Sequence, residues 1–154
     1  LDVSVPAARR AARAHDRAAS VVADAWGTLP LRTKRFSLVT CVFAPRNLRE
    51  FARVLADAGL LLVVTPDPDH LRSLRERHGL LGIEADKDDR LARAASGLFE
   101  TIGRHRVRAA LSADAALVRD LIAMGPNAFH GVPEEVDPID TEVAVSVWLF
   151  RRLG

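Results

Sequence analysis

Residues 36–66 read FSLVTCVFAPRNLREFARVLADAGLLLVVTP, and this stretch decides the fold. Its first run, 36–43, is β-branched and apolar, and its second, 60–64, is uniformly apolar, which is typical of parallel strands covered on both faces. Between the two runs, apolar residues recur at helical spacing from Leu48 to Ala58, with charged residues on the other side. The pattern predicts a right-handed strand, helix, strand unit in the middle of a sheet.

This unit also indicates where a ligand would bind. Open α/β sheets take ligands at the carboxyl ends of their strands. In this chain those ends are followed by residues 41–47 and 65–70.

Composition bounds the class of protein. A chain of 154 residues with 49% hydrophobic and 27% charged residues is expected to form one globular domain. No apolar run reaches the ~20 residues of a membrane span, and the N-terminus does not resemble a signal peptide, so we expect a cytoplasmic protein with no membrane partner. Cys41 is the single cysteine, which excludes an internal disulfide and a metal site built on several thiolates.

The basic residues are mostly arginine. Of 22, only Lys34 and Lys87 are lysines. The planar arginine fork suits phosphate, although coding bias with solvated helix faces explains the same excess. Two sets are spaced to form basic stripes that could contact phosphate groups: Arg9, Arg13 and Arg17, and Arg104, Arg106 and Arg108.

The remaining elements are predicted from caps and periodicity. They are a strand end at 1–5, a helix to about His15 capped by Ser4, a short β run at 19–23, a helix at 70–78 capped by Asp69 and ended by Gly79, a short helix at 91–95, a strand at 98–111, a helix at 113–124 capped by Ser112, and a last strand at 141–150.

Five stretches together resemble one family. They are LDVS-x-PAARRAA, VVADAW-x-x-LPL, VFAPRN-x-x-EFARVL, LLLVVTP-x-PDHL and MGPNAFHG. They are similar to the catalytic domain of the large-subunit ribosomal RNA (guanine-N1)-methyltransferases, a family that includes housekeeping enzymes and macrolide-resistance determinants. The resemblance implies an α/β, Rossmann-like class I methyltransferase sheet, mostly parallel with its last strand antiparallel, and S-adenosylmethionine as cofactor.

The resemblance also implies three cofactor-binding segments. Matched by position, they are Asp2 with Val3 at the ribose hydroxyls, Asp24 with Ala25 at the adenine, and Val42 and Phe43, within 42–45, beside the transferred methyl. A carboxylate at a strand end accepts well from vicinal hydroxyls. For Asp24, a turn or helix cap is the alternative. We expect the carboxylates of Asp2 and Asp24 to end neighbouring strands and to face a common hollow.

Three residues are candidates for the chemistry at guanine: Asp67, Asn127 and His130. His130 follows Phe129, so the pair could join a proton acceptor to a stacking platform for an extruded base. Equally, Phe129 could be core and His130 a surface histidine, and Asn127 could be only a turn residue.

The chain also departs from the family pattern. Its glycines never form G-x-G, it carries no cysteine-ligated zinc ribbon, and it starts at what resembles the second strand. A missing first strand would leave two inner sheet edges unpaired. We therefore expect residues 1–154 to be a partial methyltransferase domain, from the second strand onward, within a longer polypeptide, or to receive the strand from a partner. Without that strand, cofactor binding should be severely weakened.

The leading hypothesis is methyl transfer from S-adenosylmethionine to guanine N1 in a ribosomal RNA hairpin. This chain would be the C-terminal part of the catalytic domain, and by itself it is expected to be inactive. The alternatives are a small-molecule methyltransferase and a non-catalytic module for dimerisation or interaction, so a homodimer is a further expectation. A dehydrogenase is disfavoured because G-x-G-x-x-G is absent.

Overall fold

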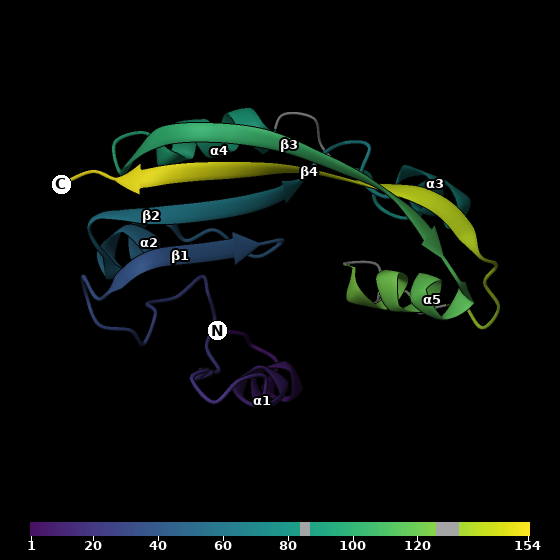
Figure 1. Ribbon diagram of the computed structural model, residues 1–154, viewed down its shortest axis with the longest axis horizontal. Coiled ribbons are helices and arrows are strands. Elements are labelled where there is room, and N and C mark those ends of the chain that lie inside the picture. The colour runs from purple at the N-terminus through teal and green to yellow at the C-terminus, as the bar shows by residue number, and fades with distance from the viewer. Residues whose placement is uncertain (84–86, 126–132) are drawn as a thin grey trace. The chain divides into compact units, whose positions relative to one another are not determined.

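The computed structural model describes residues 1–83, 87–125 and 133–154 (Figure 1). Five helices and four strands are described in these ranges. In chain order they are α1 (Val5–Ala12), β1 (Phe36–Val42), α2 (Leu48–Val54), β2 (Leu55–Pro66), α3 (Arg72–Arg77), α4 (Lys87–Ala95), β3 (Phe99–Ala113), α5 (Ala115–Met124) and β4 (Ile139–Arg152).

The four strands form one sheet in the order β1-β2-β4-β3. Figure 1 shows β4 running against the direction of the other three strands. The described sheet is therefore mixed, with its last strand antiparallel to the other three, and the predicted α/β fold class is confirmed. β2 lies inside the sheet, and Leu61 and Val63 are fully buried on it.

The expectation for residues 36–43 is wrong in one respect. β1 is a terminal strand of the described sheet, not a middle one. Of its seven residues only Cys41 is buried, and Leu38 and Val42 are about half exposed, at 49% and 52%. Because one side of β1 pairs with β2 and no described strand pairs with the other, its apolar side chains lose the cover that a middle strand would have.

The boundary between α2 and β2 also differs from the expected one. α2 ends at Val54, and Leu55 is already extended, with φ −68° and ψ 139°. The strand thus begins five residues before the apolar run that starts at Leu60. Within it the chain bends sharply: Ala58 has φ +56°, and a Cβ on Gly59 would lie 2.9 Å from the Ala56 carbonyl oxygen. Such close backbone approach is a recurrent reason for glycine in a strand.

The described residues divide into two compact units. Unit 1 comprises residues 1–63, 92–103 and 148–154, and unit 2 comprises 64–91 and 104–147. In unit 1, Phe150 stacks on Trp148 at 5.7 Å between ring centroids and meets Phe99 at 6.3 Å. In unit 2, the buried cluster is Leu74, Ala113, Val118, Ile122 and Ile139.

Of the predicted helix caps, one is observed and two are not. Ser4 caps α1 as predicted by accepting from the Ala7 N–H, but α1 ends at Ala12, so Arg17 lies outside it. The predicted caps Asp69 and Ser112 are wrong. α3 follows Leu71 with no side-chain cap, and α5 is capped by Asp114, which accepts from Leu117 N–H at 2.8 Å. No helix in the described ranges has the length and apolarity that crossing a membrane requires.

Candidate cofactor site and a buried polar cluster

Asp2 lies in an isolated parallel β-bridge of unit 1, and Asp24 lies close after its bridge partner in the chain. Asp2 and Val22 form a parallel bridge, in which Asp2 N–H donates to the Val21 carbonyl at 3.2 Å and Ala23 N–H donates to the Asp2 carbonyl at 3.1 Å. Asp24 is two residues beyond the bridge. The predicted adjacency of the two segments is confirmed, while the common hollow stays a prediction.

Each of these carboxylates uses one oxygen to close its own turn. Asp2 Oδ1 accepts from Ser4 N–H at 2.7 Å, and Asp24 Oδ1 accepts from Trp26 N–H at 2.9 Å. Neither carboxylate has another partner within the part of the chain that the structure describes. Asp24 is thus a turn cap, but the cap occupies one oxygen only. The other oxygen of each carboxylate is available to hydroxyl or amine donors.

The segment after β1 is held in a strained conformation. Val42 and Phe43 are exposed, as a ligand-facing position requires, and Phe43 has φ +50°. A left-handed conformation is uncommon for a bulky residue and persists only where its surroundings enforce it. The Cys41 thiol contributes here, because its Sγ lies 3.5 Å from the carbonyl oxygens of both Ala44 and Pro45.

Cys41 is suited to this structural role because it stays neutral. Burial raises the pKa of its thiol above the ordinary value. A protonated thiol is a weak hydrogen-bond donor and a poor nucleophile. Cys41 is therefore a core residue and not a nucleophile.

A row of polar side chains on α2, with the Asn47 that caps it, holds the segment between Trp26 and Thr33. Asn47 Nδ2 donates to the carbonyls of Trp26 and Gly27, at 3.2 and 3.0 Å. Glu50 accepts from Leu29 N–H at 2.7 Å.

Arg53 completes this row by donating to the carbonyls of Leu29 and Leu31 and to the Thr33 hydroxyl, at 2.9 to 3.0 Å. Arg53 also pairs with Glu50 through two 2.7 Å hydrogen bonds, and the pairing holds the pKa of the Glu50 carboxyl below its usual value. Sequence reasoning assigned Glu50 and Arg53 to the polar face of the helix and missed their partners. The 47, 50, 53 spacing, which repeats one helix face, was the available signal.

The other predicted cofactor residues lie at the surface of unit 1. Val3 is 68% exposed and Ala25 is partly buried. Trp26 is also 68% exposed, although tryptophan is usually a core residue. This exposure is compatible with a position at the edge of a ligand site.

Asp67 lies in unit 2, directly after β2, and is buried. Only 5% of it is exposed. Its Oδ1 accepts from the hydroxyl of the fully buried Ser146 at 2.6 Å, and its Oδ2 lies 3.9 Å from Arg106 Nε. Partners of this kind offset the cost of burying a polar group.

The Ser146 hydroxyl is the centre of a larger polar cluster. It accepts from Arg104, whose NH2 is 2.9 Å away, and lies 3.3 Å from a carboxylate oxygen of Asp88, which pairs with Arg104. Thr65 donates to the other Asp88 oxygen at 3.2 Å. Asp88 is on α4, so the cluster fastens the start of this helix to the end of β2.

The predicted arginine stripe on β3 therefore faces carboxylates. Arg104 pairs with Asp88, Arg106 lies near Asp67, and Arg108 pairs with both Asp69 and Glu142 at 2.7 Å. Each guanidinium already has an internal counter-ion, which weakens the case for this stripe as a phosphate contact.

His70 is a half-buried histidine of unit 2 that sequence reasoning did not single out. Its Nδ1 accepts from Ala144 N–H at 3.2 Å, so the neutral ring carries its proton on Nε2. Burial lowers the pKa of His70, and the nearby Arg75 lowers it further. His70 is therefore kept neutral and acts as an acceptor.

Two predicted catalytic residues, Asn127 and His130, lie outside the described residues. Two surface hollows of unit 2 are lined by other groups. One, of ≈ 330 Å³, lies between residues 112–114 and 138–140, and the other, of ≈ 280 Å³, is bordered by Asp69, Arg72, Ser73, Arg108, Thr141 and Glu142. In the described ranges no three His, Cys, Asp or Glu side chains gather as metal ligands would.

Comparison with known proteins finds related sequences and a matching fold, while no family model matches the chain. The 23S rRNA (guanine(748)-N(1))-methyltransferase of Streptomyces fradiae is 48% identical over 136 residues, which cover 88% of this chain and 49% of the relative. A proposed 23S rRNA (guanine-N(1)-)-methyltransferase of Micromonospora griseorubida is 43% identical over 161 residues, covering 99% of this chain and 55% of the relative. The chain thus spans about half the length of the curated relatives it matches.

The fold is similar to that of a solved structure of a proposed methyltransferase from Bacillus halodurans C-125. The TM-score is 0.62 with 19% sequence identity, over 97% of this chain and 80% of the other. At this identity the likeness shows the fold, which agrees with the sheet described above.

Proposed function

This chain is homologous over most of its length to the 23S rRNA (guanine-N1)-methyltransferases, and we propose from this that it forms part of a catalytic domain that transfers a methyl group from S-adenosylmethionine to guanine N1 in ribosomal RNA. The observation that carries the proposal beyond homology is the pair Asp2 and Asp24. Asp2 is bridged to Val22, Asp24 lies two residues beyond Val22, and each carboxylate keeps one oxygen without a partner among the described residues.

The cofactor proposal assigns three segments of unit 1 to S-adenosylmethionine. Asp2, with Val3, would accept from the ribose hydroxyls, and Asp24, with Ala25, from the adenine amine. Exposed Val42 and Phe43 would border the sulfonium end. When bound, the cofactor supplies an electrophilic methyl group. The protein supplies position and water exclusion, which account for much of the barrier reduction in an in-line displacement.

The proton on guanine N1 must also be removed. Its pKa is roughly 9 to 10, so a positioned acceptor can assist the transfer. Asp67, Asn127 and His130 remain the proposed groups. Asp67 is only 5% exposed and accepts a 2.6 Å hydrogen bond from Ser146. It is therefore better suited to orienting a neighbouring side chain, or an N–H group of the base, than to exchanging protons with solvent.

We propose further that residues 1–154 are a partial methyltransferase domain and that another strand pairs with the outer edge of β1. Three observations support this: β1 is terminal in the described sheet, Leu38 and Val42 are about half exposed on it, and the relatives are about twice as long. An unpaired apolar edge is unfavourable in water and accepts a further strand readily. The homology to bacterial rRNA enzymes also supports cytoplasmic localisation.

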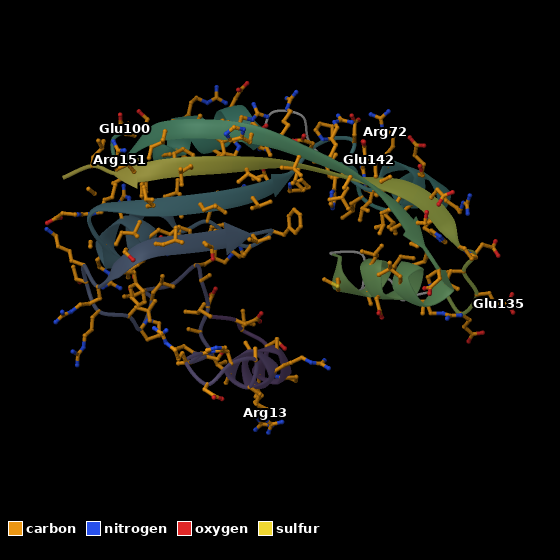
Figure 2. The ribbon with its side chains drawn as sticks, in the orientation of Figure 1. Arg13, Arg72, Glu100, Glu135, Glu142 and Arg151 are labelled. Atoms are coloured by element: carbon orange, nitrogen blue, oxygen red, sulfur yellow. The ribbon has the colours of Figure 1, made fainter. Side chains whose placement is uncertain are left out.

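Ribosomal RNA is the proposed partner, and the charge distribution supports unit 1 as the side that meets it. Unit 1 carries 13 Lys and Arg against 6 Asp and Glu, a formal charge of +7, whereas unit 2 has 9 against 14, or −5. Arg9 and Arg10 on α1, and Arg13 at its C-cap, have no ion-pair partner among the described residues. Figure 2 shows the Arg13 side chain extending away from its helix.

Calorimetric titration with S-adenosylhomocysteine tests the function. The 154-residue chain would be compared with a chimera in which the N-terminal part of the Streptomyces fradiae relative precedes it. Weak binding by the chain and tight binding by the chimera is the expected result. No binding by either form would reject the methyltransferase assignment in favour of a non-catalytic module. Tight binding without methyl transfer to 23S rRNA fragments would instead favour a small-molecule substrate.

A further inference from the structure

Asn47 joins two of the three proposed cofactor segments. It follows the strained turn after β1, where it caps α2, and its side chain reaches the turn that begins at Asp24. We infer that Asn47 is a positioning residue for the nucleoside end of the cofactor, holding the Asp24 turn at a set distance from the segment after β1. This inference rests on the proposed function.

The hydrogen bonds fix the orientation of the Asn47 amide. Nδ2 faces two carbonyl oxygens, those of Trp26 and Gly27, at 3.2 and 3.0 Å, while Oδ1 accepts from Glu50 N–H at 3.3 Å. A flipped amide would place its oxygen against both carbonyls and its nitrogen against an N–H donor. One side chain therefore performs two separable tasks: the oxygen caps the helix and the nitrogen binds the turn.

Asn47 anchors the far end of the Asp24 turn, while the start of the turn is anchored by Ala23 N–H, which donates to the Asp2 carbonyl at 3.1 Å. Asp24 Oδ1 closes the turn locally on Trp26 N–H, and Gly27 N–H donates to the Asp24 carbonyl at 3.3 Å. These local bonds shape the turn but do not anchor it to the rest of unit 1. The bonds from Asn47 do so at Trp26 and Gly27, within three residues of the carboxylate proposed to bind adenine. Glu50 anchors the chain only beyond this point, at Leu29.

Asn47→Asp separates the two tasks. Aspartate keeps the cap oxygen and is itself a favoured N-cap, but it replaces the donor by a second oxygen that repels both carbonyls. Helix α2 should therefore remain, while the Asp24 turn is released. We expect S-adenosylhomocysteine to bind about tenfold more weakly, because two modest hydrogen bonds are lost and the new oxygen repels both carbonyls. Asn47→Ser, which caps without repulsion, should show a smaller loss.

The test combines calorimetry with NMR relaxation of the backbone amides of Trp26 and Gly27. It is carried out on the 154-residue chain or on the chimera with the N-terminal part of the Streptomyces fradiae relative, whichever binds S-adenosylhomocysteine. Support requires both greater motion at these amides and weaker binding in Asn47→Asp. Unchanged amide motion, or released amides with wild-type affinity, would overturn the inference.

A matched control excludes a general loss of stability. Ile122→Val removes one methylene in the core of unit 2, far from this turn in sequence, and should lower the unfolding midpoint without changing affinity. If Ile122→Val weakens binding as much as Asn47→Asp does, Asn47 acts only through stability and the inference fails. If the wild-type protein does not bind in either form, the proposed function itself fails, which the titration of the unmutated protein shows independently.

Discussion

The hydroxyl of Ser146 donates a 2.6 Å hydrogen bond to the carboxylate of Asp67, and both side chains are buried. The two residues are 79 positions apart in the chain and are brought together by β2 and β4, which are neighbours in the sheet. Because the same hydroxyl also contacts Arg104 and Asp88, one small side chain satisfies several charged groups.

Replacing Ser146 with alanine should destabilise the protein by about 1–3 kcal/mol, since the substitution leaves a buried carboxylate without its donor. Urea denaturation followed by circular dichroism measures the change. Ser112→Ala is the matched control: Ser112 makes an equally short bond, 2.6 Å to Asp140, but at the surface, so its loss should stay within about 0.5 kcal/mol. If Ser146→Ala and Ser112→Ala lower the free energy of unfolding equally, burial is not the reason that the Ser146 hydrogen bond matters.

Stability should fall as the pH is lowered through about 6.5, the ordinary pKa of histidine. Burial and Arg75 lower the pKa of His70 in the folded protein, so the unfolded chain binds the proton more readily and protonation favours unfolding. The slope contributed by one group is at most about 1.4 kcal/mol per pH unit. Denaturant titrations between pH 5 and 8 would measure it.

The variant His70→Asn isolates this contribution. Asparagine can offer an acceptor to Ala144 N–H in place of Nδ1 but does not titrate in this range. The dependence of stability on pH near 6.5 should therefore be shallower in the variant. The same slope in both proteins would show that another group is responsible.

The edge of β1 should promote self-association of the isolated chain. Leu38→Lys places a charge on this exposed edge and should reduce association, because edge lysines oppose strand pairing. Sedimentation velocity at increasing concentration is the measurement. Leu117→Lys, at an exposed position of α5, is the control and should change association little. Monomeric wild-type protein at all concentrations would contradict this prediction.

Removal of charge from α1 and its C-cap should weaken RNA binding more than removal of the same charge elsewhere. In Arg9→Gln/Arg10→Gln/Arg13→Gln, each phosphate contact that is lost should lower the slope of log K against log salt by about 0.7 to 0.9. Fluorescence anisotropy with a labelled 23S rRNA hairpin, at several salt concentrations, measures both affinity and slope.

The control for this experiment is a triple variant with the same change in charge. The three arginines chosen are already ion-paired. Arg72 pairs with Asp69, and Arg108 pairs with both Asp69 and Glu142. Arg151 pairs with Glu100, and Figure 2 shows these two residues side by side. Replacement of the three arginines by glutamine should leave the salt slope close to that of the wild type. If the two triple variants lose affinity equally, α1 is not a preferred contact.

Sequence reasoning predicted the elements well where the periodicity was strong. β1, α2, the interior position of β2, the long β3 and the last strand β4 all occur where the patterns indicate. Local chemistry was sufficient for Ser4, which caps α1, and for Gly79, whose φ of +59° follows the end of α3. It was insufficient for Asp69, because an aspartate before a helix can cap it or pair with arginine. In this fold Asp69 meets Arg72 and Arg108 instead.

In the candidate site, too, some features follow from the sequence and others only from the tertiary structure. The amino-acid sequence by itself determined the α/β class, the family resemblance and the positions of Asp2 and Asp24, because these depend on local periodicity and on short motifs. Only the tertiary structure decided that Asn47 reaches the Trp26 and Gly27 carbonyls, that Ser146 binds Asp67, and that the β3 arginines face carboxylates. The physical reason is that these contacts join residues 16 to 79 positions apart, and a side chain's choice among distant partners depends on how strands pair and helices pack, which no local pattern contains.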